Sequence, residues 1–414
     1  MNTTGPMVIV GGGQCGARAA HALRDNGWDR EIVLLGNECV LPYERPPLSK
    51  AVLLQERTTQ QCTIYDDAFY KEHGIEVCLD ATVTSIDRAQ RKVQLSDGNS
   101  VAYHRLLIAT GAQPRQFEPS GGLEGVHVLR SVTDAHAIQE ELLPGRRIAV
   151  VGAGFIGLEV AASAVARGCK VVVLEAAARA LMRAVPEVVA ECLIEKHRAS
   201  GVDVRFSARI TRMTGDTRVN GLLLEDGTLI PCDAVVVGIG VTPRIELAQR
   251  AELAIDNGIA VDAILRTSDP DIFAAGDVCS FLHPLYGRRI RLECWKNAED
   301  QARIAARNML GHDEKCNSVP WFWSDQYDMT IQIAGLPSLG SVTAVREMGA
   351  NSRVFFALDG DGVLVGASGV GQIGDIAKDV RMSQELIAQR ARVSPQMLAD
   401  RKVKLRSLLM AEEQ

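Results

Sequence analysis

Two glycine-rich turns in this chain have the spacing that lets a backbone approach a phosphate closely. Gly11–Gly16 follows the apolar run Val8–Val10, and Gly152–Gly157 follows Ala149–Val151. In each turn the first glycine allows the bend, the second approaches a pyrophosphate, and the third lets helix and strand pack. The helix start then offers free N–H groups and partial positive charge. One such turn alone can be an ordinary loop. Two of them predict two dinucleotide sites and electron transfer between the bound molecules.

Both glycine turns belong to longer units that end in the same way. The first unit continues to Asp97-Gly98 and then to the buried run Leu106–Gly111. The second continues to Asp226-Gly227 and then to Val235–Gly240. In both units the apolar run starts nine residues after the aspartate. We therefore expect a duplicated β-α-β architecture with parallel sheets and right-handed crossovers.

The residue that ends the second strand of each unit indicates which nucleotide is bound. Glu175 holds this position in the second unit, where a carboxylate accepts from both ribose hydroxyls and repels a 2′-phosphate. This favours NADH over NADPH, although Arg179 and Arg183 follow closely and either can reach a phosphate. In the first unit Asn37 takes the ribose position, and Glu38 can share the task.

Four charged side chains outside the glycine turns can do chemistry at a redox cofactor. The proline-braced loop Leu41–Lys50 delivers Arg45, whose donor fork suits a pyrophosphate, and Lys50, which can lie against an electron-accepting ring. Glu159 lies in the first turns of the second helix, where it either stabilises the helix start or pairs with Lys50. The alternative for Lys50 is a solvated side chain. Asp277, after Gly276, can accept from polyol hydroxyls.

The elements that position these residues divide the chain into expected domains. Strands are expected at Met7–Val10, Glu31–Leu35 and Lys170–Leu174, and a helix at Ala17–Arg24. Short antiparallel strands are expected at Val83–Ile86, Lys92–Leu95 and Ser100–Tyr103. A helix-like stretch is expected to open at Gly276-Asp277 and to resume near Glu293–Leu310; a hairpin is expected around 359–362 and a helix at Asp375–Ala391. Residues 1–114 with 244–320 are expected to bind FAD, 115–243 to bind NADH, and 321–414 to form an α+β domain.

Bulk composition excludes several other classes of protein. The 414 residues carry a net charge of −6, which argues against nucleic-acid binding, and no apolar run approaches a membrane span. None of the ten cysteines forms a Cys-x-x-Cys pair, which disfavours a redox dithiol, a zinc site and an iron–sulfur cluster. The N-terminus enters a strand at once, so we expect no signal peptide and a cytoplasmic location. No metal is expected.

The chain resembles the FAD- and NADH-dependent ferredoxin reductases of the putidaredoxin reductase type, which include reductase components of bacterial Rieske-type aromatic-ring dioxygenases. The motifs that carry this resemblance are V-I-V-G-G-G-Q-C-G, L-P-Y-E-R-P-P-L-S-K, L-L-I-A-T-G, V-V-G-A-G-F-I-G-L-E-V-A, I-F-A-A-G-D and W-F-W-S-D-Q-Y. The match is good over residues 7–340 and looser beyond. It implies an α/β fold with two Rossmann-like domains arranged as in glutathione reductase, and a C-terminal α+β interface domain.

The resemblance also implies roles for single residues. Lys50 would reach the reactive nitrogen of the flavin and pair with Glu159, so these two are the expected catalytic residues. The residues implied to bind FAD are Gly11, Gly13, Cys15, Gly16, Asn37, Glu38, Arg45, Val83, Thr110, Gly111, Arg130, Asp277, Trp295 and Trp323. The residues implied to bind NADH are Gly152, Gly154, Ile156, Gly157, Glu175, Gly240 and Glu293. The family usually has an acid at position 37, so Asn37 departs from its pattern.

The implied activity is electron transfer from NADH through FAD to a [2Fe–2S] ferredoxin, expected to be acidic, that feeds a dioxygenase. Trp321 and Trp323 are candidates for the docking edge, as is the basic stretch 378–406. Four alternatives stay open: a haem-thiolate monooxygenase system as the recipient, an NADH oxidase or peroxide reductase that uses Cys39, a non-enzymatic signalling flavoprotein, and Rossmann units kept only as structural relics. The terminal substrate and the choice between a monomer and a dimer also stay open. Neither nucleic acid nor a membrane is an expected partner.

Overall fold

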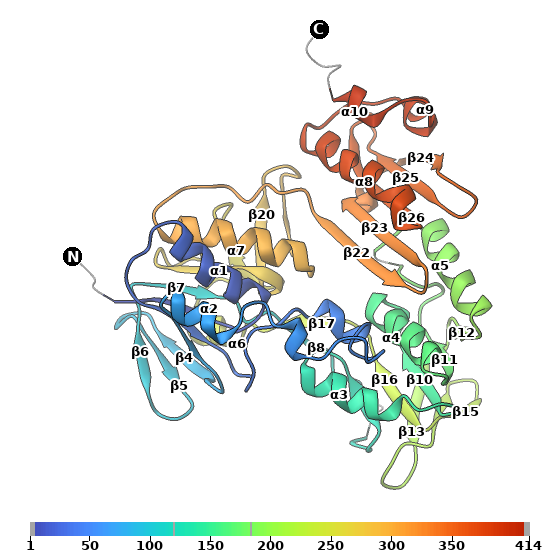
Figure 1. Cartoon of the computed structure of the whole chain (residues 1–414), viewed down its shortest axis with the longest axis horizontal. Coiled ribbons are helices and arrows are strands. Elements are labelled where there is room, and N and C mark those ends of the chain that lie inside the picture. Colours follow the sequence, from blue (N-terminus) through green and yellow to red (C-terminus); the bar gives the residue numbers. More distant parts are fainter. Residues whose placement is uncertain (1–4, 119–120, 183, 410–414) are drawn as a thin grey trace. The chain divides into compact units, whose positions relative to one another are not determined.

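The computed structural model describes residues 5–118, 121–182 and 184–409, which fold into two compact units (Figure 1). The first unit contains Met1–Pro46, Thr58–Gln113 and Val241–Ser318. The second contains Pro47–Arg57, Pro114–Gly240 and Val319–Gln414. The chain therefore leaves the first unit twice before Val319, once for a short segment and once for a long one. The three domain boundaries expected from the sequence stay a prediction.

A five-stranded parallel sheet forms the centre of the first unit. Its strand order is β19–β7–β1–β2–β3. The strands are β19 (Ile272–Ala274), β7 (Arg105–Ile108), β1 (Met7–Val10), β2 (Ile32–Leu35) and β3 (Ile75–Cys78). β1 and β2 are buried throughout, which explains why they are continuous apolar runs instead of alternating ones. The sheet brings the carboxyl ends of β1, β2, β7 and β19 to one edge.

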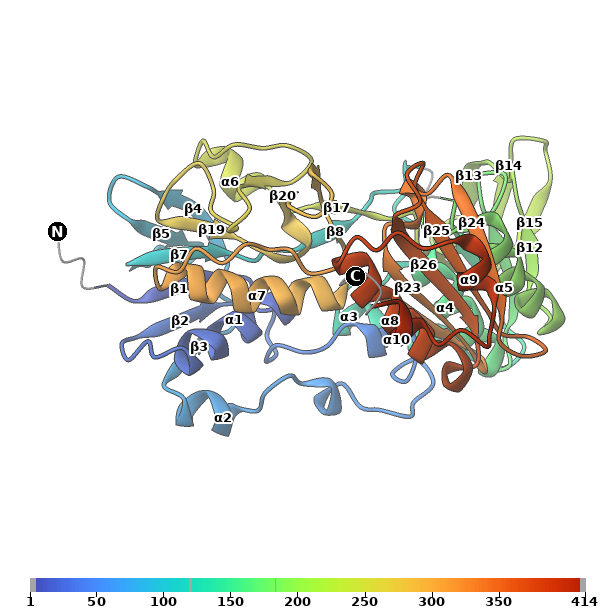
Figure 2. The same cartoon turned by 90° about the horizontal axis from the view of Figure 1, so that it is seen from above.

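Two helices pack together in the first unit, α1 (Gln14–Asp25) and α7 (Trp295–Met309), which run side by side in Figures 1 and 2. Alanines such as Ala19, Ala302 and Ala305 are buried in these helices, so their axes can approach closely. α1 begins three residues earlier than the expected start at Ala17, because Gly13 serves as its N-cap. The helix therefore starts inside the glycine turn, with its free N–H groups at the carboxyl edge of the sheet.

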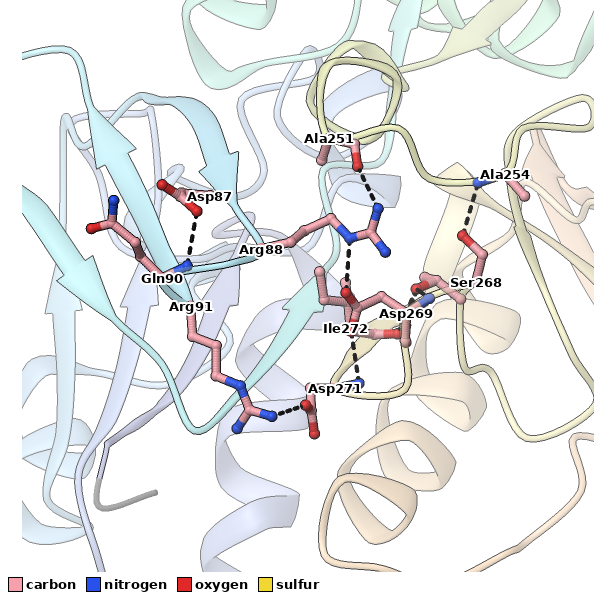
Figure 3. A network of polar contacts seen from close by, with 11 residues as sticks. Asp87, Arg88, Gln90, Arg91, Ala251, Ala254, Ser268, Asp269, Asp271 and Ile272 are labelled. Carbon is pink, nitrogen blue, oxygen red and sulfur yellow. Dashed lines mark hydrogen bonds and ion pairs between the residues drawn. The ribbon is translucent and has the colours of Figure 1, made fainter. Parts of the chain in front are cut away.

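A polar network fixes the loop that leads into β19 (Figure 3). This loop faces the turn of the antiparallel sheet β4 (Val83–Asp87), β5 (Lys92–Leu95) and β6 (Ser100–Ala102), which was predicted from the sequence. Arg88 pairs with Asp269 at 2.8 Å, and Arg91 pairs with Asp271. Arg88 also donates to the carbonyl of Ala251. These contacts hold the strand that delivers Gly276 and Asp277.

The second unit contains a second five-stranded parallel sheet, of order β12–β11–β10–β16–β9. Its strands are β12 (Asp203–Arg205), β11 (Lys170–Leu174), β10 (Arg147–Val151), β16 (Ala234–Val237) and β9 (Val126–Val128). Helix α4 (Phe155–Ala166) follows β10 through the second glycine turn, and α5 (Glu187–Ala199) precedes β12. The repetition predicted from the two glycine patterns is therefore present as two parallel sheets.

The C-terminal part of the second unit is an antiparallel sheet of order β22–β23–β26–β25–β24. Its strands are β22 (Trp321–Gln326), β23 (Met329–Gly335), β26 (Leu364–Gly371), β25 (Arg353–Leu358) and β24 (Val342–Glu347). Helix α8 (Ile373–Ala388) packs on β23 and β26 (Figure 2). The hairpin predicted around 359–362 joins β25 to β26, and Gly362 takes the positive φ of +76° that such turns need.

One expected element is wrong. Gly276 and Asp277 do not open a long helix-like stretch; they form the short 3-10 turn η4 (Gly276–Val278), and the chain then enters β20 (Cys279–His283) and β21 (Arg288–Ile290). β20 pairs in parallel with β18 (Ile259–Val261), and this pairing outweighs local helix preference. The helix α7 begins only at Trp295. Among the described residues, no helix has both the length and the apolar character to cross a membrane.

Candidate functional sites for two dinucleotides

The first glycine turn is shaped for a ligand and not only for packing. A Cβ on Gly11, whose φ is +125°, would lie 2.2 Å from the Ala109 carbonyl oxygen, and one on Gly16 would lie 2.0 Å from that of Gly11. Neither position can therefore accept a side chain without a shift of the backbone, whether or not a ligand is bound. A Cβ on Gly13 would meet no described heavy atom within 4 Å, so the space in front of this glycine is open. Open space at a helix start fits a pyrophosphate.

The carboxylate of Asp277 lies next to the first glycine turn. A Cβ on Gly276 would lie 3.2 Å from the Cβ of Cys15, so η4 packs against the first residues of α1. Burial raises the pKa of the Cys15 thiol, and the negative charge of Asp277 adds to this effect. Burial likewise raises the pKa of Cys294 to about 12, with Asp277 contributing. Both thiols therefore stay protonated at neutral pH and add no negative charge beside Asp277.

Arg45 is held by a fixed set of partners. Its guanidinium bonds Glu38 at 2.8 Å and the Tyr43 hydroxyl at 3.0 Å, and Tyr43 donates to Glu38 at 2.6 Å. Burial alone would lower the pKa of Arg45, but Tyr43, Glu38 and Asp277 outweigh it and raise the pKa. Glu38 thus orients the arginine that was expected at the pyrophosphate. Asn37 is exposed beside this cluster, at the end of β2.

The remaining predicted FAD residues of the first unit are Thr110, Gly111, Val83 and Trp295. The Thr110 hydroxyl donates to the Arg244 carbonyl at 2.9 Å, and the Gly111 carbonyl accepts from the Arg244 N–H at 3.0 Å. Val83 is buried at the start of β4. Trp295 is the first residue of α7. Glu293, which was expected to bind NADH, also belongs to the first unit, where it pairs with Arg291 at 2.5 Å.

Two residues near this edge were missed by sequence reasoning. Arg291 donates to the backbone carbonyl of Asp277 at 3.3 Å and therefore links Glu293 to η4. Gln14 lies at the first position of α1, and neither amide atom of its side chain has a hydrogen-bond partner among the described residues, although both atoms are buried. Such atoms normally find partners, so their environment fits a bound polar group. No feature of the sequence pointed to either residue beyond its proximity to a glycine or aspartate motif.

The second glycine turn repeats the geometry of the first. A Cβ on Gly152, with φ +101°, would lie 2.5 Å from the Gly238 carbonyl oxygen, and one on Gly157 would lie 2.2 Å from that of Gly152. A Cβ on Gly154 would find its nearest neighbour only at 3.7 Å. Ile156, on the first turn of α4, is 46 % exposed. A turn without a tight contact at its middle glycine, flanked by an exposed apolar side chain, fits a nucleotide that covers both. Gly240, with φ +101°, follows β16 at the same edge.

Glu175 has a second role that the sequence did not indicate. Its carboxylate accepts the Ala153 N–H at 2.7 Å and the Ala177 N–H at 2.8 Å. It therefore holds the glycine turn in place and keeps lone pairs for a ribose. Arg179 donates to three backbone carbonyls of its own loop, namely those of Ala180, Met182 and Val185. Arg183 lies outside the described residues.

We expect Glu175→Ala to lower kcat/KM for NADH about tenfold, because a charge-assisted hydrogen bond to the ribose is lost. The value for NADPH should fall less or rise, since the carboxylate that repels the 2′-phosphate is gone. Steady-state kinetics with both nucleotides measure this ratio, and Glu187→Ala, on the exposed first turn of α5, is the control. An unchanged NADH-to-NADPH ratio would contradict the assigned role.

The predicted pairing of Lys50 with Glu159 is present within the second unit. The Lys50 Nζ lies 2.8 Å from Glu159 Oε1. The Ser324 hydroxyl donates to the same oxygen at 2.6 Å, and the Ser49 hydroxyl donates to Oε2. Glu159 is only 3 % exposed and uses its carboxylate for these three side chains. Of the two interpretations of Glu159, the structure therefore supports the ion pair with Lys50 and not stabilisation of the helix start.

Two further predicted FAD residues belong to the second unit. Arg130 precedes α3 (Val132–Glu141), and its N–H donates to Asp134 at 3.0 Å. Trp323 stacks on Trp321 with ring centroids 5.2 Å apart, and its indole N–H donates to Asp325 at 3.1 Å. Their expected places beside a flavin stay predictions, as does that of Lys50.

Comparison with known proteins agrees with two dinucleotide sites. The family model described as pyridine nucleotide-disulphide oxidoreductase matches residues 5–302, and the reductase C-terminal model matches residues 321–409. The chain is 43 % identical to the anthranilate 1,2-dioxygenase system ferredoxin–NAD(+) reductase component of Burkholderia cepacia, covering 98 % of this chain and 99 % of the relative. It is 36 % identical to putidaredoxin reductase CamA of Pseudomonas putida, covering 99 % and 98 %.

A solved structure extends this similarity to the whole fold. The covalent putidaredoxin reductase–putidaredoxin complex matches with a TM-score of 0.94 at 35 % identity, covering 99 % of both chains. The sequence motifs, the two parallel sheets and the two glycine turns therefore have one explanation. The chain belongs to the pyridine nucleotide-disulphide oxidoreductase family and, within it, to the ferredoxin reductases that use FAD and NAD(H).

Proposed function

We propose that this protein moves electrons from NADH through FAD to a [2Fe–2S] ferredoxin that feeds a Rieske-type aromatic-ring dioxygenase. One observation carries the proposal: two complete glycine turns, each without a tight contact at its middle glycine, stand at the carboxyl edges of two parallel sheets on one chain. The relative from Burkholderia cepacia, whose name specifies a dioxygenase system, supports the choice of recipient. All ten cysteines are free, so electrons have no disulfide to enter.

The residues of the chain bind, orient and provide charge in this reaction. FAD and NADH supply the redox chemistry when they are bound. We assign Gly11, Gly13 and Gly16 with Arg45 to the FAD phosphates, and Asp277 to its polyol. Gly152, Gly157 and Glu175 hold NADH, and Glu175 also fixes the turn that receives the phosphates. Lys50 supplies a positive charge at the flavin, and Glu159 holds that charge in place.

An acidic ferredoxin is the proposed partner, because the end of the chain is basic. Residues 378–406 contain eight basic side chains, all exposed, and three acidic ones. One of the acids, Asp379, pairs inward with the buried Arg346 at 2.9 Å, so its charge is already compensated. The basic residues are Lys378, Arg381, Arg390, Arg392, Arg401, Lys402, Lys404 and Arg406. Such a surface raises the association rate of an acidic partner.

We expect ferredoxin-dependent turnover to fall about tenfold between low and high salt, because ions screen this attraction. Reduction of the flavin by NADH, measured by stopped flow in the same buffers, should change little. The double variant Arg401→Glu, Lys402→Glu should show the same loss of ferredoxin-dependent turnover already at low salt. Arg212→Glu, an exposed position on β13 (Ile210–Thr214), should not show this loss. A flat salt profile would count against the acidic partner. Absence of any NADH-dependent ferredoxin reduction would refute the proposed function.

A haem-thiolate monooxygenase system is the second candidate recipient, since it would receive electrons through the same kind of ferredoxin. The similarity to putidaredoxin reductase keeps this candidate open. Parallel assays with the purified ferredoxin of each type separate the two, and the higher kcat/KM identifies the recipient. We also propose a cytoplasmic location, supported by the free cysteines, which are typical of a reducing compartment.

A further inference from the structure

A line of buried hydrogen bonds runs from Glu159 away from Lys50. The Ser324 hydroxyl lies 2.6 Å from Glu159 Oε1, and the Gln326 side-chain nitrogen lies 3.0 Å from the Ser324 oxygen. The Gln326 oxygen lies 2.7 Å from Nε2 of His197, whose Nδ1 lies 3.0 Å from the Tyr327 hydroxyl. All of these residues belong to the second unit. The line is thus continuous over four hydrogen bonds.

Three of the residues in this line are buried, and they come from two elements, β22 and α5. Ser324, Gln326 and His197 are 1 %, 3 % and 0 % exposed. Ser324 and Gln326 are two apart on β22, so their side chains point to the same face of the sheet. His197 lies in the last turn of α5, and Tyr327 stands in the turn after β22 with a φ of +57°. Burial makes each unpaired polar atom costly, so the line is under strong constraint.

The direction of every hydrogen bond follows from the carboxylate. An ionised Glu159 only accepts, so Ser324 donates to it and accepts from the Gln326 amide. The Gln326 oxygen must then accept from His197 Nε2–H, which leaves Nδ1 to accept from the Tyr327 hydroxyl. Burial lowers the pKa of His197, and burial also raises the pKa of Tyr327 to about 12, so both rings stay neutral near pH 7. All four donors therefore point toward Glu159.

The charged groups that face the line sit at its two ends. Lys50, from the segment after η1 (Pro46–Ser49), and Glu159, from α4, form one end. At the other end, Lys196 of α5 pairs with Asp328 at 2.6 Å and lies 5.9 Å from the Tyr327 ring centroid. Between these ends the connection consists of neutral dipoles. An amide such as that of Gln326 does not take up or release a proton near neutral pH, so the line orients charge and does not conduct protons.

We propose that Ser324, Gln326 and His197 are positioning residues that hold the Glu159 carboxylate aimed at Lys50. This inference rests on the proposed function, because it concerns the charge that the Lys50–Glu159 pair presents to the flavin. It assigns the C-terminal sheet a part in accepting electrons from NADH, in addition to any part in ferredoxin docking. The C-terminal sheet acts on Glu159 through the hydroxyl group of Ser324.

The test compares Ser324→Ala with Ser368→Ala in the FAD-loaded protein. Ser368 lies on β26 of the same sheet, is 0 % exposed, and its hydroxyl has no hydrogen-bond partner among the described residues. We expect Ser324→Ala to slow flavin reduction by NADH about tenfold, since a slightly displaced charge costs rates of this order. Ser368→Ala should match the wild type.

A double-mutant cycle separates this role from general damage to the sheet. In a Glu159→Gln background, Ser324→Ala should change the reduction rate little, because the carboxylate on which it acts is absent. Gln326→Leu should resemble Ser324→Ala in the wild-type background. Equal reduction rates for Ser324→Ala and Ser368→Ala would overturn the proposal, as would an undiminished effect of Ser324→Ala in the Glu159→Gln background.

A second measurement needs no turnover. In protein with 15N-labelled histidine, the His197 ring, assigned by its loss in His197→Asn, should be the Nε2–H tautomer and should not titrate between about pH 6 and 8, where free imidazoles do. A titrating ring or an Nδ1–H tautomer would overturn the proposal even if Ser324→Ala failed to fold. Wild-type protein that NADH does not reduce would instead refute the proposed function, and the tautomer would still report on the line.

Discussion

Replacing Lys50 with methionine is expected to slow the reduction of bound FAD by NADH about 100-fold, which is the usual cost of removing one preorganised charge or donor. Methionine keeps much of the length of the side chain and removes the ammonium. The side chain of Lys50 is 21 % exposed and its Nζ lies 2.8 Å from a nearly buried carboxylate, so water cannot easily replace the lost charge. Stopped-flow absorbance at the flavin band measures the effect, with FAD content and thermal unfolding recorded alongside.

The matched control for this change is Lys71→Met. Lys71 also pairs with a carboxylate, that of Asp67 one turn earlier on α2 (Asp67–Glu72), but its side chain is 75 % exposed. An exposed pair of this kind contributes between about 0 and 1 kcal/mol, so the control should behave as wild type. Equal reduction rates for Lys50→Met and wild type would remove Lys50 from the reaction. Loss of FAD from Lys50→Met would show that the residue serves binding instead.

The sequence predicted the parts of the fold that depend on local pattern. The strands Met7–Val10 and Lys170–Leu174 have the expected bounds, since short apolar runs before glycine turns leave few alternatives. The stretch after Asp277 was wrong because β20 is stabilised by pairing with β18, whose residues lie about twenty positions earlier. Such pairing depends on tertiary contacts that composition does not reveal.

The candidate sites were predictable to a similar extent. Glycine spacing located both turns, and the proline-braced loop led to Lys50 and its pairing with Glu159. Nothing in the sequence connected Glu159 to Ser324, which is 165 residues away, or to His197 on another helix. Nor did the sequence show that Glu175 holds the turn through the Ala153 N–H. These residues act through contacts that only the folded chain brings together.

Alanine at the third glycine of each turn should separate the two dinucleotide sites. A Cβ on Gly157 would lie 2.2 Å from the Gly152 carbonyl oxygen, and one on Gly16 would lie 2.0 Å from that of Gly11. Because both neighbours are backbone atoms, the start of the helix has to move, and displacements near 1 Å cost about 100-fold in rate. We expect Gly157→Ala to keep its FAD and to lose about 100-fold in kcat/KM for NADH. Gly16→Ala should be purified without flavin.

Gly374→Ala is the control for both glycine variants, because Gly374 also lies in the first turn of a helix, α8, and a Cβ there would meet no described heavy atom within 4 Å. Alanine favours a helix over glycine by about 0.5–1 kcal/mol, so this variant should be slightly more stable than wild type and fully active. Dithionite should still bleach Gly157→Ala, which shows that its flavin is intact and that only delivery of electrons from NADH is lost. If NADH reduced Gly157→Ala at the wild-type rate, or if Gly16→Ala retained FAD, the two turns would not be the two nucleotide sites, and the assignment of electron flow between them would fail.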